Sequence, residues 1–193
     1  MRMPRSRSPI SSSPKKSLAD PNWRVRAAGP ADADALSLVA SATFLDTYAG
    51  SLDGSDMVAH CAANNRPEKF AAWINDPSDA VTIGEILPGF APVGYAVLTS
   101  GIDLPVTLEH GDIELRRIYT LSRMRGSGLG PALMRQVIED AARLSCRRIL
   151  LGVWGENYRA HRFYERHGFT IVGTRQFKVG NVVHDDLVYA RPV

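Results

Sequence analysis

Cysteine is scarce in this chain of 193 residues, which contains only Cys61 and Cys146. Neither belongs to a Cys-x-x-Cys pair, so the sequence provides neither zinc-ribbon spacing nor a disulfide framework. Of the five histidines, His161 and His167 lie six positions apart on one predicted helix and so point to different sides. We therefore expect no metal site, and we interpret the two cysteines as packing residues.

Long hydrophobic runs are also missing. No stretch reaches the roughly 20 apolar residues that a membrane-spanning helix requires. The beginning of the chain is charged but lacks the apolar core of a signal peptide. These absences predict a soluble, cytoplasmic protein with no membrane partner.

Residues 1–21 differ from the rest of the chain, since they are rich in Ser and Pro and hold five basic residues against one acidic residue. A segment with so little to bury cannot offset its ordering entropy, so we predict a disordered tail. The tail has a net charge of +4, whereas the whole chain has a formal net charge of +3. The remainder is therefore near −1. A near-neutral domain argues against nucleic acid as a partner. Residues 22–193 have enough apolar surface for one α/β domain.

The hydrophobic periodicity predicts an alternation of strands and helices with no internal repeat. Strands are expected at Trp23–Ala27, Ala80–Leu87, Val93–Thr99, Ile113–Thr120, Arg148–Val153, Thr170–Phe177 and His184–Tyr189. Helices are expected from Pro30 to about Phe44, over Asp56–Asn64 and Pro67–Asn75, from Pro131 as a first helical residue, and over Asn157–His167.

A glycine-rich turn, Gly126-Ser127-Gly128-Leu129-Gly130, lies between a predicted strand and a predicted helix. The start of a helix leaves N–H groups unpaired and carries partial positive charge, so this arrangement is typical of phosphate binding. A nucleotide P-loop would continue with Lys and Ser or Thr, whereas Pro131 and Ala132 follow here. The Gly-x-Gly-x-Gly spacing, past the middle of the chain, also departs from a dinucleotide-binding fingerprint.

The segment Arg123-Met-Arg-Gly126-Ser-Gly128 resembles the pyrophosphate loop of the GNAT N-acetyltransferases, Gln/Arg-x-x-Gly-x-Gly/Ala. The strand before it, from Glu114 to Thr120, is similar to the fourth strand of that family. Asn157 to Phe169 matches the second motif, Asn-x-x-Ala-x-x-Phe-Tyr-x-x-x-Gly-Phe, at every fixed position. Many relatives have Val-x-Pro where this chain has Thr120-Leu121-Ser122, so the strand end differs.

This resemblance covers the chain from Trp23 to its end and implies the α/β GNAT fold. That fold has a mixed, mostly antiparallel central sheet flanked by helices, with parallel strands 4 and 5 splayed apart. Here those strands would end at Thr120 and Val153. The resemblance further implies that acetyl-CoA donates the acetyl group to an amine.

A narrower resemblance, to the polyamine N-acetyltransferase branch, rests on Thr43 to Tyr48, Phe177-x-x-Gly180 and Asp186-Leu187. It implies a primary amine of a small molecule, polyamine-like or amino-acid-like, that attacks acetyl-CoA directly in a ternary complex. Acetylation of protein or peptide N-termini, and a non-catalytic acyl-CoA-binding module, remain as alternatives. Homodimerisation is left open.

The reaction needs a base and an acid. An alkylamine with a pKa near 10.4 is protonated at neutral pH, so a proton must be removed before attack. The resemblance implies Glu114 as that base, directly or through a water, although it could instead pair with Arg116 or Arg117. Tyr164 would protonate the leaving thiolate of coenzyme A; its alternative role is an ordinary core aromatic.

The remaining site residues would hold the two substrates. Backbone groups from Ile118 to Thr120 would pair with pantetheine and stabilise the oxyanion. Arg125 would pair with a phosphate rather than only with solvent, and Asn157 would bind pantetheine, cap its helix, or both. The expected cofactor contacts are Ile118, Tyr119, Thr120, Arg125, Gly126, Ser127, Gly128, Leu129, Gly130, Pro131, Asn157 and Tyr164. For the acceptor amine, Phe44, Tyr48 and Trp154 are candidate walls, unless they are plain core, and Asp46 is a candidate partner for its positive charge.

Overall fold

The computed structural model describes residues 22–179 and 182–193, with side chains for 22–176 and 185–193. The predicted tail and Gly180 lie outside the described residues, as does the side chain of Phe177. In chain order the elements are β1 (Trp23–Ala27), η1 (Pro30–Asp32), α1 (Ala33–Tyr48), α2 (Gly54–Asn64), α3 (Pro67–Asn75), β2 (Ala80–Ile86), β3 (Ala91–Thr99), β4 (Asp112–Thr120), η2 (Ser122–Met124), α4 (Leu129–Arg143), β5 (Arg148–Trp154), α5 (Tyr158–Arg166), β6 (Thr170–Val179) and β7 (Val182–Pro192).

The strands form one sheet in the order β1-β2-β3-β4-β5-β7-β6. All neighbouring strands pair antiparallel except β4 and β5, which are parallel. The predicted mixed, mostly antiparallel sheet is therefore confirmed.

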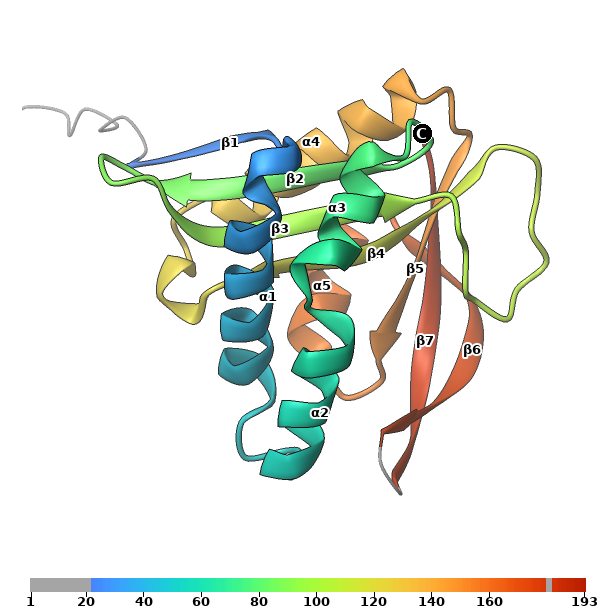
Figure 1. Cartoon of the computed structure of the whole chain (residues 1–193). Helices are drawn as coiled ribbons and strands as arrows, with labels where there is room; N and C mark the ends of the chain where they lie inside the picture. The colour runs from blue at the N-terminus through green and yellow to red at the C-terminus, as the bar shows by residue number, and fades with distance from the viewer. Residues whose placement is uncertain (1–21, 180–181) are drawn as a thin grey trace, which may run out of the picture.

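The parallel pair is short. Strands β4 and β5 are in register only at Asp112 with Arg148, Ile113 with Ile149 and Glu114 with Leu150. Strand β4 then continues to Thr120 and β5 to Trp154, while β5 stays paired with β7 over its whole length. The two strands diverge from their meeting point (Figure 1), which confirms the predicted splay.

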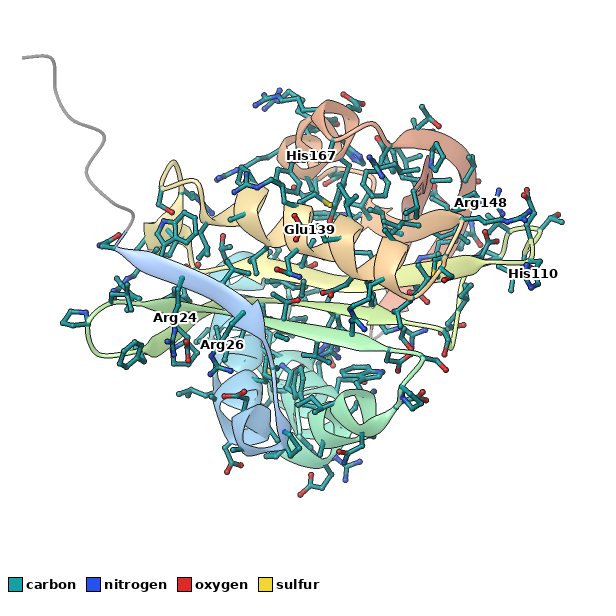
Figure 2. The ribbon with its side chains drawn as sticks, turned by 90° about the horizontal axis from the view of Figure 1, so that it is seen from above. Arg24, Arg26, His110, Glu139, Arg148 and His167 are labelled. Carbon is teal, nitrogen blue, oxygen red and sulfur yellow. The ribbon has the colours of Figure 1, made fainter. Side chains whose placement is uncertain are left out.

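Helices cover both faces of the sheet. Viewed from above, α4 and α5 lie on one face and α1 and α3 on the other (Figure 2). Helix α4 buries a stripe at three- and four-residue spacing, because that spacing brings side chains onto one side of a helix. The buried apolar residues of the helix are Leu129, Ala132, Leu133, Met134, Val137 and Ala141. On the opposite face, α1 and α3 pack Leu36, Val39, Ala40, Phe70 and Trp73 against β2 and β3.

Two predicted helix boundaries were wrong. Helix α1 continues past Phe44 to Tyr48, because no Gly or Pro interrupts it and the amide of Ala49 still bonds to the carbonyl of Leu45 at 3.0 Å. Helix α4 begins at Leu129, so Pro131 is its third residue and not its first. The missing N–H of Pro131 still falls among the amides that a helix start leaves unpaired.

Among the described residues, no helix combines the length and apolar character needed to cross a membrane.

Candidate active site

The glycine-rich turn joins the end of the β4 segment to α4. Gly126 and Gly128 have φ angles of +75° and +87°, in the left-handed region that L side chains rarely adopt. A Cβ added at Gly126 would meet nothing within 4 Å, so the backbone conformation, not lack of space, favours glycine there. The conformation places the turn directly before the positive end of the 15-residue α4.

Some amides of this turn are already used within it. The N–H of Ser127 donates to the Met124 carbonyl at 3.2 Å, and the N–H of Leu129 donates to Ser127 Oγ at 3.3 Å. The amides of Gly126, Gly128 and Gly130 have no acceptor among the described residues. Three N–H groups are thus available for an anion at the start of α4.

Trp23 of β1 contacts the glycine-rich turn, and the sequence did not predict this contact. Its indole N–H donates to the Ser127 carbonyl at 3.0 Å. A Cβ on Gly128 would lie 3.5 Å from the Trp23 ring. Arg125, on the same turn, is exposed and has no ion-pair partner among the described residues, so its charge is available for a phosphate.

Tyr48 of α1 forms a hydrogen bond with Tyr119 of β4, and the charges of Tyr164 and Asp186 also reach its hydroxyl. The negative charge that Tyr119 would carry is the largest cause of a raised pKa at Tyr48, followed by burial and a hydrogen bond with Tyr119. Tyr164 and Asp186 raise the pKa of Tyr48 further. Burial raises the pKa of Tyr164, and Tyr119 adds to that shift. Side chains from β4, α5 and β7 are therefore within electrostatic range of the Tyr48 hydroxyl at the end of α1.

Glu114 is 5% exposed and forms the ion pair that was its alternative role. Its Oε2 accepts a hydrogen bond from Arg116 Nη2 at 2.7 Å and another from the backbone N–H of Asp103 at 2.9 Å. Both donors bind the same carboxylate oxygen. The function of Glu114 as a base stays a prediction.

Asn157 caps α5, because its Oδ1 accepts the N–H of Ala160 at 3.1 Å. This is the helix-capping role weighed from the sequence. A hydrogen bond from Asn157 to pantetheine stays a prediction.

The residues predicted for the acceptor come from two elements, α1 and β5. Phe44 contacts Tyr48 with ring centroids 4.8 Å apart, and it stacks on His60 of α2 at 4.1 Å and 4°. Trp154 ends β5, in register with Asp186 of β7. His60 was not identified from the sequence, because only the packing of α2 against α1 brings its ring to Phe44.

Asp46 is exposed, and Ser122 binds both of its oxygens. The Ser122 N–H donates to Oδ2 at 2.5 Å and the Ser122 hydroxyl donates to Oδ1 at 2.9 Å. Asp46 thereby ties the end of α1 to the segment that follows β4. Its predicted role as a partner for a cationic amine is not favoured by these contacts.

Among the residues with described side chains, no group of three or more His, Cys, Asp and Glu could hold a metal ion.

A sheet that opens between two parallel strands, beside a glycine-rich helix start with free amides, defines an α/β domain of the acyl-coenzyme A-binding class. The profile of the acetyltransferase (GNAT) family matches residues 43–169. A protein of Mycobacterium tuberculosis (strain H37Rv), named an uncharacterized N-acetyltransferase, is 35% identical over 164 residues, which are 83% of this chain and 97% of that protein. The chain belongs to the GNAT family and is an acetyl-CoA-dependent N-acetyltransferase.

More distant similarities agree with this assignment. A spermine/spermidine N(1)-acetyltransferase of Bacillus subtilis is 30% identical over 96 residues, covering 49% of this chain and 63% of that protein. The PaiA N-acetyltransferase of Thermoplasma acidophilum, solved with coenzyme A, superposes with a TM-score of 0.70 at 17% identity, over 89% of this chain and 99% of that chain. At that identity the structural similarity shows the shared fold.

Proposed function

We propose that the acceptor is a primary amine of a small molecule, polyamine-like or amino-acid-like, which attacks acetyl-CoA directly in a ternary complex. The observation that carries this proposal is that Tyr119, Tyr164 and Asp186 all act on the Tyr48 hydroxyl, from elements on both sides of the separation of β4 and β5. A partly apolar opening that also contains phenols and a carboxylate suits an amine on a short carbon chain. The partial similarity to the Bacillus subtilis spermine/spermidine enzyme supports the polyamine class.

The cofactor would lie along the splayed strands. The amides of Gly126, Gly128 and Gly130, with Arg125, suit its pyrophosphate, and the end of β4 would pair with the pantetheine arm. The further contacts proposed are Ile118, Tyr119, Thr120, Ser127, Leu129, Pro131 and Asn157. Acetyl-CoA supplies an acetyl group activated as a thioester.

Proton transfers are assigned to two residues. Glu114 would receive the proton of the ammonium group through a water, since Arg116 and the Asp103 amide bind only one of its oxygens. Tyr164 would donate its proton to the departing sulfur. Its raised pKa keeps the phenol protonated throughout the neutral range, as a general acid requires.

A panel of acceptors, read by coenzyme A release and by detection of the amide product, tests the proposal. The panel contains polyamines, simple alkylamines, amino acids and peptides with free N-termini. Release with small primary amines is expected. Release with peptides alone would indicate an N-terminal acetyltransferase, and binding of coenzyme A without release on any amine would indicate a non-catalytic module.

A further inference from the structure

Asp186 is a buried carboxylate with one oxygen unpaired. The residue is 4% exposed, and its Oδ2 is 3.2 Å from both Nε and Nη2 of Arg175. Its Oδ1 is also buried and has no hydrogen-bond partner among the described residues. A buried charged oxygen without a donor is unfavourable, so its retention points to a ligand that supplies the donor.

Neighbouring strands fix the orientation of this carboxylate. Asp186 lies opposite Arg175 of β6 and opposite Trp154 of β5. Arg175 lies across Gly152 of β5, where an added Cβ would come within 2.8 Å of the guanidinium carbon. Glycine at this position thus gives Arg175 room to reach Oδ2, and the bond to Oδ2 fixes the direction of Oδ1.

The strand register places Asp186 beside the part of β5 that has separated from β4. Trp154, its register partner, lies in the part of β5 that β4 does not pair. Asp186 and Tyr164 both act electrostatically on the hydroxyl of Tyr48. Asp186 and the phenol assigned as the acid are therefore both within electrostatic range of the Tyr48 hydroxyl. Glu114 differs, because its Oε2 already accepts two hydrogen bonds.

We propose that Asp186 Oδ1 binds the ammonium group of the acceptor, an inference that rests on the proposed function and assigns its amine-binding residue. An ammonium group would donate one N–H to Oδ1 in a charge-assisted hydrogen bond. Its positive charge would also offset the negative charge of the buried carboxylate. Asp186 thereby selects cationic amines and orients the nitrogen, and the base removes the proton afterwards.

The test is Asp186→Asn, which keeps the shape and an oxygen for Arg175 but removes the charge. With the best amine of the panel, the KM for the amine should rise roughly 10- to 100-fold, the effect of losing a hydrogen bond to a charged group. The KM for acetyl-CoA should stay within about twofold. Asp185→Asn is the matched control, since Asp185 is the adjacent residue on β7 and is exposed, and its amine KM should not change.

Asp186→Glu separates charge from packing. The Glu variant keeps the charge, so its amine KM should lie closer to wild type than that of the Asn variant. An amine KM within about twofold of wild type in a folded Asn variant would overturn the proposal. Equal impairment of both variants, in folding or in coenzyme A affinity, would show a structural role and also overturn it. A wild-type protein that acetylates no amine of the panel would instead refute the proposed function, and the inference with it.

Discussion

Tyr164, proposed as the general acid, shows how burial sets the protonation of a single side chain. Burial disfavours the phenolate, and the nearby Tyr119 disfavours it further, so the pKa lies above the ordinary value of 10.0. Below that pH the hydroxyl holds its proton. A tyrosine in this environment can give a proton to a thiolate but cannot act as a base at neutral pH.

Replacing Tyr164 by Phe should lower kcat about 100-fold, within the range for loss of a general acid, and leave the KM for acetyl-CoA nearly unchanged. Because the pKa is raised, wild-type activity should show no alkaline loss from this group below pH 10. Steady-state kinetics across pH check both points. Tyr158→Phe changes an exposed tyrosine of the same helix and should be silent. A Phe variant as fast as wild type would refute the assignment of the acid.

Gly126→Ala tests whether coenzyme A binding requires the left-handed backbone conformation of the turn. Its φ of +75° and the open space around it mean that Ala introduces conformational strain of about 1 kcal/mol without a clash. We expect lower stability in urea and weaker binding of coenzyme A by calorimetry. Gly50→Ala, with φ of +88° and equally open surroundings, should lose similar stability and keep its affinity for coenzyme A. Equal affinities in the two variants would count against the turn as the phosphate site.

At the scale of elements, local sequence patterns predicted most of the helices and strands. The stripe on α4 and the alternation of strands and helices follow from periodicity, and the parallel pair of β4 and β5 came from resemblance to a family. Contacts between distant segments were not predictable. Trp23 meets Ser127 across 104 positions and Asp46 meets Ser122 across 76, and no local pattern encodes either hydrogen bond.

The contact between β1 and the turn gives a prediction of its own. Trp23→Phe keeps most of the aromatic packing and removes the N–H that binds the Ser127 carbonyl. Loss of about 1 kcal/mol should raise the KM for acetyl-CoA roughly fivefold, with kcat unchanged. Initial-rate kinetics with varied acetyl-CoA measure this. An unchanged KM for acetyl-CoA would mean that the glycine-rich turn keeps its conformation without the hydrogen bond from Trp23.

At the scale of the molecule, ion pairs stabilise two well-separated parts of the sheet, the edge strand β1 and the parallel pair of β4 and β5. Arg24 and Arg26 lie on β1, while Arg148 lies at the opposite end of the view (Figure 2). Arg26 binds Asp32 at 2.7 and 2.8 Å, and Arg148 binds Asp112 at 2.8 and 2.7 Å. Hydrogen bonds from these arginines are the main cause of the lowered pKa values of Asp32 and Asp112.

These lowered values give stability a definite dependence on pH. A carboxylate whose pKa is lower in the folded state stabilises the fold above its unfolded pKa, about 3.9 for Asp. That contribution is lost as the pH falls further, through the folded value. We expect the free energy of unfolding, measured in urea, to decrease as the pH falls from 5 to 2. Asp32→Asn and Asp112→Asn should be less stable at pH 7 and show a shallower decrease. Slopes identical to wild type would contradict this explanation.

The bridge between Asp46 and Ser122 connects the side proposed for the amine with the side proposed for the cofactor. Asp46 lies near the end of the helix that carries Phe44 and Tyr48, and Ser122 begins the short turn that leads to the glycines. Any displacement of that helix would be passed through these two hydrogen bonds to the glycine-rich turn. Thermodynamic reciprocity then requires that whatever the amine does to cofactor affinity, the cofactor does equally to amine affinity.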